Sequence, residues 1–201
     1  MKTTVLESDN ARTWCRRVLV LAFAATLGAC ESPLNLDGVE HRKTVPIRRS
    51  DMFQEAASNG NALVVVGNHG LVLRSTDDGA TWARQELPQW PSLIDLAACP
   101  DGQLAALATE GEVLVSTDDG QTWAPHPIET EESPQGITCD PVNRLWVVGS
   151  FSTIIVSADG GETWDDKSMG DDTIFTTIQF LDEQNAVIFG EFGSTVHSRD
   201  G

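Results

Sequence analysis

The amino-acid sequence predicts an all-β fold built from repeated antiparallel sheets, and three observations support this. A motif recurs without gaps every 41 residues, with its first serine at positions 75, 116, 157 and 198. Each repeat contains about four short apolar runs separated by Gly, Asp and Asn, a pattern typical of antiparallel strands. No window long enough for a helix has a 3.6-residue period. Four strands in about 41 residues is the size of one propeller blade, so the sequence predicts a β-propeller of four-stranded blades.

The expected strands occupy matching places in successive repeats. In the second repeat the apolar runs are 93–98, 103–108, 112–116 and 122–127. In the third repeat they are 135–139, 144–149, 153–157 and 163–168. One blade cannot bury both of its faces, whereas stacked blades can.

The repeats extend over residues 51–201, which we expect to be a partial propeller of about three and a half blades. Closed propellers have about four to eight blades, and the fourth repeat stops at Ser198-Arg199-Asp200-Gly201 inside its motif. We therefore expect a truncated sequence that lacks about three further blades, or roughly 120–150 residues, from a ring of about seven.

The segment before the repeats has the composition of an export signal. Residues 1–29 begin polar, continue with the apolar run 18–27 and end in small residues, as secretory signal peptides do. The apolar run is shorter than the roughly twenty residues that a spanning helix needs. Leu27-Gly28-Ala29-Cys30 resembles a bacterial lipobox, which implies cleavage before Cys30 and lipidation of that cysteine. The alternative is an ordinary signal peptide that happens to contain a cysteine.

The lipobox resemblance implies a location as well as an anchor. Glu31 follows the lipidated cysteine in place of the Asp that marks retention at the inner membrane. The resemblance therefore implies an exported, membrane-anchored lipoprotein at the periplasmic face of the outer membrane. Residues 30–50 form the expected lipidated N-terminus and linker, whose basic part, 41–50, either contacts anionic headgroups or is simply solvated.

The charge balance excludes one class of partner. The chain has 13 Lys+Arg and 30 Asp+Glu, a formal net charge of -17. Removal of residues 1–29 would leave 9 bases (13 minus 4) and 28 acids (30 minus 2), a charge of -19. Nucleic-acid binding needs a basic face, so we expect no nucleic-acid partner. Such an acidic surface also repels anionic lipid, so membrane contact is expected through the N-terminal lipid alone.

Two cysteines remain beyond the lipobox, and the repeat register bears on whether they pair. In the 41-residue register Cys139 aligns with Ala98, and Cys99 aligns with Asp140. Neighbouring residues of a strand point to opposite faces, so we expect the two thiols not to face each other. An exported protein nevertheless offers an oxidising environment, which leaves a disulfide open.

The recurring motif reads Ser-x-Asp-x-Gly-x-Thr-Trp and is expected to form the turn between the third and fourth strands. Gly permits a positive φ, Asp and Ser can bond to turn backbone groups, and Trp can fold back over the hairpin. The motif residues are Ser75, Asp77, Gly79, Thr81, Trp82, Ser116, Asp118, Gly120, Thr122, Trp123, Ser157, Asp159, Gly161, Thr163, Trp164, Ser198 and Asp200.

This motif resembles the Asp box, or BNR repeat, of six- to eight-bladed propellers. Asp boxes occur in sialidases, in sortilin-like receptors and in non-enzymatic assembly factors, where they lie at the blade periphery. The wider pattern, with VG-xxG before SxDGGxTW, is similar to the photosystem II assembly and stability factor family. That resemblance implies a non-catalytic propeller whose partner is a protein, such as a membrane-protein complex under assembly. The basic patch of that family is not evident here, because residues 51–201 contain five bases and 25 acids.

The alternative is a glycosidase of the BNR-repeat class, sialidase-like, or a carbohydrate-binding protein. Sialidases use a Tyr nucleophile and three arginines, and this chain has no Tyr. Other glycosidases need two carboxylates at a fixed separation, and nothing in the sequence selects a pair. We therefore assign no catalytic residue and expect no enzyme activity in the residues present.

No cofactor or metal site is expected either. The four histidines are isolated, without the spacing of metal ligands. The pairs Asp77-Asp78 and Asp118-Asp119 could suggest calcium, but they lack the dense ligand spacing of a calcium loop, and turn capping accounts for them better.

Overall fold

The computed structural model describes residues 38–39 and 44–201. The expected signal peptide, residues 1–29, and the expected lipidation site Cys30 lie outside the described residues. Contacts divide the chain into two units, Met1–Thr44 and Val45–Gly201, and the second contains every strand named below. Within the described part of the chain, no helix combines the length and apolarity needed to cross a membrane.

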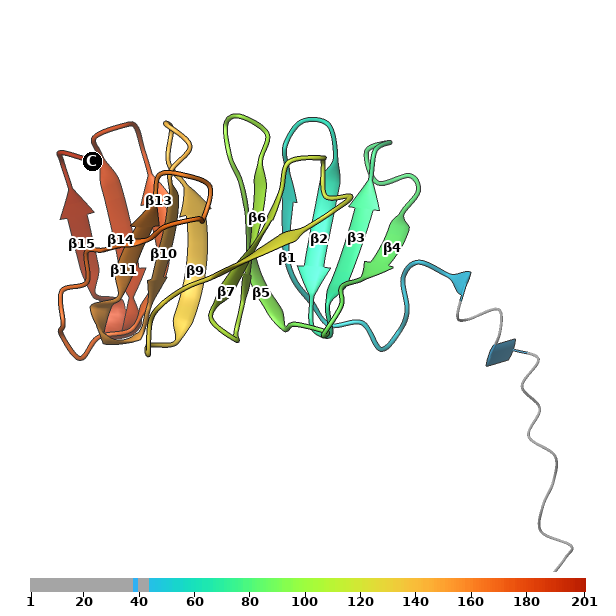
Figure 1. The fold of residues 1–201 in the computed structure, drawn as a ribbon, viewed down its shortest axis with the longest axis horizontal. Coiled ribbons are helices and arrows are strands. Elements are labelled where there is room, and N and C mark those ends of the chain that lie inside the picture. Colours follow the sequence, from blue (N-terminus) through green and yellow to red (C-terminus); the bar gives the residue numbers. More distant parts are fainter. Residues whose placement is uncertain (1–37, 40–43) are drawn as a thin grey trace, which may run out of the picture. The chain divides into compact units, whose positions relative to one another are not determined.

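Four antiparallel sheets follow one another along the chain, each with its strands in sequence order (Figure 1). Sheet one contains β1 (Phe53–Ser58), β2 (Leu63–Gly67), β3 (Leu71–Ser75) and β4 (Ala83–Glu86). Sheet two contains β5 (Leu93–Ala98), β6 (Leu104–Ala108), β7 (Glu112–Ser116) and β8 (Ala124–Pro127). Sheet three contains β9 (Pro134–Cys139), β10 (Leu145–Gly149), β11 (Ile154–Ser157) and β12 (Asp165–Asp166). Sheet four contains β13 (Phe175–Phe180), β14 (Ala186–Gly190) and β15 (Thr195–Ser198).

The expected all-β architecture of propeller blades is confirmed. The only other regular elements that the structure defines in Val45–Gly201 are two short 3-10 turns, η1 (Ser150–Ser152) and η2 (Glu191–Gly193). Strands β5 and β7 coincide with the expected runs 93–98 and 112–116. One strand is much shorter than expected: the run 163–168 contributes only the two residues of β12.

The apolar core lies between neighbouring sheets, and β6 shows why. All five residues of β6 are fully buried, because both faces of sheet two are covered. Leu104 and Ala106 pack in the cluster shared with sheet one, whereas Ala105 and Leu107 pack in the cluster shared with sheet three. Alternating side chains of one strand thus serve two different cores. A third cluster joins sheets three and four.

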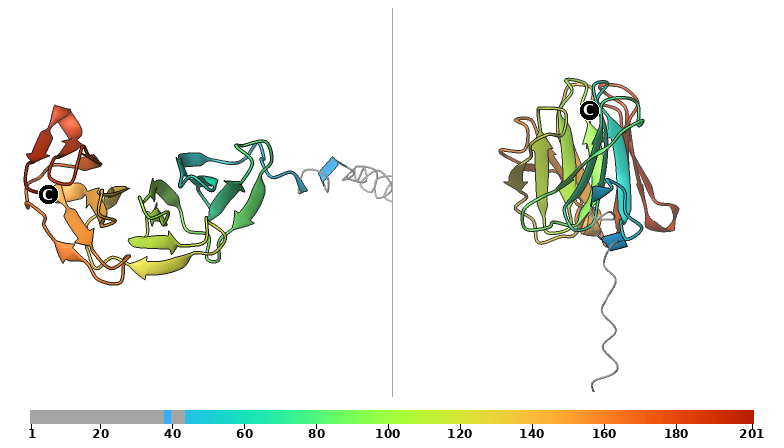
Figure 2. Two further views of the ribbon diagram at one scale, coloured as in Figure 1. Left: turned by 90° about the horizontal axis from the view of Figure 1, so that it is seen from above. Right: turned by 90° about the vertical axis from the view of Figure 1, so that its right-hand side faces the viewer.

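The first strands of the sheets lie side by side on the inner side of the row. β1 contacts β5, β5 contacts β9 and β9 contacts β13. Within this unit the sheets form a curved row, and β4, β8 and β12, the fourth strands of the first three sheets, lie on its outer side (Figure 2). At one end of the row lie the turns between the first and second strands of each sheet, together with the Asp boxes, and we call it the turn end. The other end carries the turns between second and third strands and the segments that join successive sheets, and we call it the connection end.

The compact unit begins inside the segment that the sequence suggests as a linker. Asp51 and the carbonyl of Pro46 both accept hydrogen bonds from the Arg84 guanidinium, at 2.9 and 3.1 Å. Arg48 Nη1 lies 3.0 Å from Glu86 Oε1. Burial alone would raise the pKa of Asp51, but hydrogen bonds and charge from Arg84 and Arg48 outweigh it and lower that pKa. Residues 45–51 are therefore bound to β4.

Candidate functional site

The three complete Asp boxes form the turns between third and fourth strands. In the first, Ser75 Oγ donates to Asp77 Oδ1 at 2.8 Å and accepts from the N–H of Gly79 at 2.9 Å. The Thr81 N–H and hydroxyl donate to the two oxygens of Asp77, at 2.8 and 2.6 Å. The same four bonds recur in the second and third boxes. In the fourth repeat Ser198 Oγ donates to Asp200 Oδ1 at 3.2 Å.

The tryptophans of the boxes are half-buried. Trp123 packs against the core between sheets one and two, and Trp164 against the core between sheets two and three. Each indole is thus wedged between its own sheet and the preceding one, and one edge of it faces solvent. Glycine is needed at Gly120, where φ is +80° and a Cβ would come within 3.0 Å of Val64.

The Asp boxes make stability depend on pH. The pKa of Asp77, Asp118 and Asp159 is lowered to about 2 in each case, mainly by the N–H and hydroxyl of the Thr four residues later. A lowered folded-state pKa adds stability that is present above the unfolded pKa of about 3.9 and lost as pH falls toward about 2. We therefore expect the urea midpoint to fall between pH 4 and pH 2.

A matched variant separates this effect from general acid denaturation. Replacing Thr81, Thr122 and Thr163 by Val removes three hydroxyl donors and should flatten the fall in midpoint over that pH range. An equally steep fall in wild type and variant would contradict the assignment.

The inner side of the row is lined by polar groups from the first strands. The side chains of Glu55, Gln135 and Thr176 are exposed there. Asp95 on β5 accepts the N–H of Ile137 on β9 at 2.8 Å and so ties two sheets together. Burial raises the pKa of Asp95, and the nearby Glu55 charge adds to that rise.

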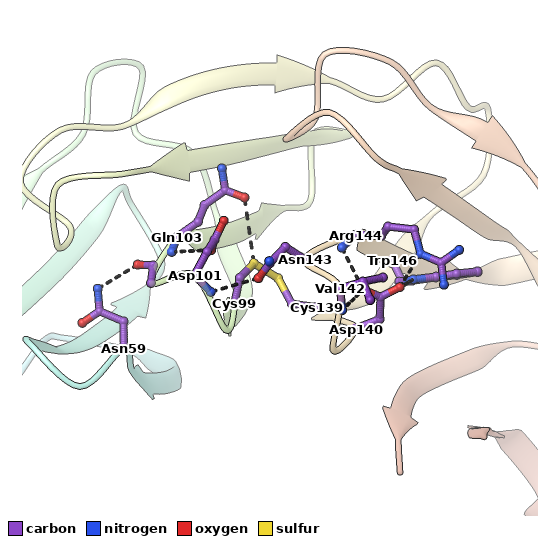
Figure 3. Close-up of a disulfide and its surroundings, with 11 residues drawn as sticks. Asn59, Cys99, Asp101, Gln103, Cys139, Asp140, Val142, Asn143, Arg144 and Trp146 are labelled. Atoms are coloured by element: carbon purple, nitrogen blue, oxygen red, sulfur yellow. Dashed lines mark hydrogen bonds and ion pairs between the residues drawn. A yellow bond between two sulfur atoms is a disulfide. The ribbon is translucent and has the colours of Figure 1, made fainter. Parts of the chain in front are cut away.

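At the turn end a disulfide joins sheets two and three, which corrects the expectation from the repeat register. Cys99 and Cys139 are bonded, with their Cα atoms 5.1 Å apart (Figure 3). Cys99 lies one residue beyond β5, in a turn where its N–H donates to the Gln103 carbonyl at 2.8 Å. The alternation of faces holds only within a strand, so a residue in a turn can meet a partner that the strand register would exclude.

Asp140, next to the disulfide, is a buried carboxylate that organises the β9–β10 turn (Figure 3). It accepts the N–H groups of Val142 and Arg144, the Arg144 guanidinium and the Trp146 indole N–H, the last at 3.0 Å. The Arg144 guanidinium lies over the Trp146 ring, 5.2 Å from its centroid. Burial alone would raise the pKa of Asp140, but the hydrogen bonds from Trp146, Arg144 and Val142 outweigh it and lower that pKa.

Further bonds join the turns of neighbouring sheets at this end. Asn143 Oδ1 accepts the N–H of Asp101 at 2.9 Å, and Asn59 Nδ2 donates to the Gly102 carbonyl at 2.8 Å (Figure 3). The ends of the first strands line a shallow pocket of about 540 Å³ that includes the disulfide. The turn end is thus a surface cross-linked by a disulfide and by hydrogen bonds between neighbouring turns.

A groove of about 860 Å³ lies between the outer strands of sheets two and three. Its apolar lining includes Ile128, Ile155 and the indole of Trp164, with the ring of Phe151 at the connection end. None of its polar side chains forms a recognised metal cluster: the described residues contain no group of three or more His, Cys, Asp or Glu that could hold a metal.

Comparison with known proteins addresses the family. A sequence profile described as "Photosynthesis system II assembly factor YCF48" matches residues 130–198, which cover sheet three and most of sheet four. No curated protein sequence matches the chain. Among solved structures, "YCF48 bound to D1 peptide" is similar, with a TM-score of 0.60 and 20% identity over 78% of this chain. Residues 130–198 thus resemble the YCF48 family, and the fold of the chain is that of an Asp-box propeller. The chain spans about half of the YCF48 chain, 53% of whose length is covered.

The fold of this chain is shared with enzymes as well. A catalytically inactive virginiamycin B lyase from Staphylococcus aureus, solved with quinupristin, has a TM-score of 0.56 and 14% identity, over 76% of this chain and 57% of the lyase. The GH74 enzyme of Niastella koreensis has a TM-score of 0.59 and 16% identity, over 75% of this chain and 23% of the enzyme. At these identities the likeness concerns the fold alone.

Proposed function

We propose that this chain is a non-catalytic, exported protein-binding factor that assists the assembly of a membrane-protein complex. The observation that carries the proposal is the match of residues 130–198 to the YCF48 assembly-factor profile, on a fold similar to that of YCF48 bound to D1 peptide. The cross-linked turn end and the groove between sheets two and three give such a factor defined surfaces on which a partner can bind.

The proposed location is a membrane surface, reached through a lipid on Cys30. The lipobox-like Leu27-Gly28-Ala29-Cys30 supports this part of the proposal, with an exported lipoprotein at the periplasmic face of the outer membrane as the expected form. The net charge of -17 opposes direct contact of the protein surface with anionic headgroups, which leaves the lipid as the anchor.

One pair of strains tests anchoring and binding separately. The wild-type chain and Cys30→Ala, each with a C-terminal affinity tag, are expressed in a Gram-negative host, and membranes are separated from soluble periplasm. We expect the wild type in the membrane fraction and the variant in the soluble fraction. Unchanged partitioning of the variant would contradict the lipid anchor.

The binding function is tested by cross-linking the same tagged chain in membranes and identifying captured proteins. We expect one membrane-protein subunit to be enriched over an unrelated lipoprotein of the same abundance. Sustained turnover on a panel of glycans and sialosides, without such a partner, would instead support the carbohydrate-active alternative.

A further inference from the structure

The groove between sheets two and three runs along the outer strand of sheet three, which is short. Strands β4 and β8 each have four residues, whereas β12 has two, Asp165–Asp166. Beyond β12 the chain stays bound to its own sheet without forming a regular strand. The N–H groups of Lys167 and Met169 donate to the carbonyls of Ile154 and Ser152, and Ser168 Oγ accepts the N–H of Ile154. One wall of the groove is therefore an irregular segment, whereas the other is the full strand β8.

One of the residues that line this groove has an unpaired donor. Trp164 lines the groove, and its Nε1 is buried and has no hydrogen-bond partner in the structure. The equivalent indole one repeat earlier, Trp123, donates to the Gly120 carbonyl at 3.2 Å. A buried N–H without a partner is destabilising, so an acceptor that reached this atom from the groove would gain a hydrogen bond.

The groove also displays an aromatic ring on a strained backbone. Phe151 has φ 51° and ψ 41°, the left-handed region that non-glycine residues rarely adopt. His69 and Phe192 also have a positive φ at this turn position, so the backbone shape belongs to the turn. What matters for the groove is that Phe151 is 52% exposed beside it, and exposed aromatic rings are common where a partner binds.

The charge and the edges of the groove restrict what can enter. Its lining includes the carboxylates of Glu129, Glu132, Glu162 and Asp166, and none of the described residues that line it is Lys or Arg. Pro125 and Pro127 leave β8 without N–H donors at two of its four positions. A ligand is therefore expected to insert side chains into the groove and not to extend sheet two as a further strand.

We propose that this groove binds an extended peptide segment with apolar side chains flanked by Lys or Arg. The apolar side chains contact Phe151 and Ile155, a backbone carbonyl accepts from Trp164 Nε1, and the basic groups face the carboxylates at the rim. The proposal rests on the protein-binding function above, and it assigns the site and the chemistry of the bound segment.

The test uses fluorescence anisotropy of the full chain with a labelled peptide, Lys-Leu-Phe-Arg-Leu-Phe-Lys. The comparison peptide has Glu in place of each Lys and Arg. We expect saturable binding of the basic peptide only, weakening as salt is raised.

Two variants have matched controls one repeat away. Phe151→Gly removes the ring and relieves the backbone strain, so the fold is preserved, and binding should weaken about tenfold. Its control is Phe192→Gly, at the same turn of sheet four, where φ is 54°.

Trp164→Phe removes the free donor and should weaken binding about two- to tenfold. Its control, Trp123→Phe, loses an indole that already has a partner. Both controls should change binding less than about twofold.

Absence of saturable binding, equal binding of the acidic peptide, or equal losses in variants and controls would each overturn the groove assignment. The proposed protein-binding function is tested separately, by the cross-linking experiment. If Phe151→Gly captures the same membrane subunit as the wild type in the cross-linking experiment, the groove assignment fails while the protein-binding function stands.

Discussion

Replacing both Cys99 and Cys139 with Ala is expected to lower the free energy of unfolding by about 4 kcal/mol. The disulfide closes a loop between residues 40 positions apart, and cross-linking a loop of that length removes much of the freedom of the unfolded chain. It also links sheets two and three, which otherwise share only their apolar core and a few polar contacts.

Urea denaturation of oxidised wild type, reduced wild type and the double variant measures this effect. Reductant should shift the wild type toward the variant and leave the variant unchanged. A double variant with the midpoint of the oxidised wild type would show that the disulfide contributes nothing to stability.

Asp140→Ala is expected to cost about 3–5 kcal/mol, because it leaves a buried network without its acceptor. The variant would leave the Trp146 indole N–H and two backbone N–H groups unpaired and the Arg144 guanidinium without its counter-charge. The pKa of this carboxyl is lowered in the folded protein, so its contribution is present above pH 4 and is lost as the carboxyl becomes protonated in acid.

Asp182→Ala is the matched control for this experiment. Asp182 caps the equivalent turn of sheet four through the N–H groups of Gln184 and Asn185, but its side chain is exposed. Water can replace the lost acceptor there, so the loss should be clearly smaller. Equal losses for the two variants at pH 7, measured by urea denaturation, would contradict the role given to burial.

The sequence repeat predicts the sheets well because it carries the core pattern of every blade. The gap-free spacing places equivalent apolar residues on equivalent strands, and β5 and β7 begin and end where the sequence predicts. The repeat fails at β12, where the acidic pair Asp165–Asp166 is followed by the irregular segment up to Gly170. The repeat register fails for the disulfide for a related reason, because Cys99 lies one residue outside the strand whose alternation the register assumes.

The groove could not be predicted from the repeat, because residues at equivalent positions of the motif have different neighbours in different sheets. Trp123 and Trp164 occupy the same place in the motif, yet only Trp123 finds an acceptor within its own box. One signal was available in the sequence: the turn position held by His69 and Glu110 in the first two repeats is Phe151 and Phe192 in the next two. Aromatic residues in tight polar turns are a reason to suspect a contact surface.

The disulfide and the groove lie at opposite edges of the same interface, between sheets two and three. The covalent link pins the inner edge, where β5 meets β9, while the groove lies along the outer strands. Relative movement of these two sheets is therefore a rotation about the linked inner edge, where β5 and β9 meet. Small rotations change the spacing of the inner strands least and the width of the groove most. The outer edge can adjust to side chains of different size, while the inner contacts that define the fold keep their positions.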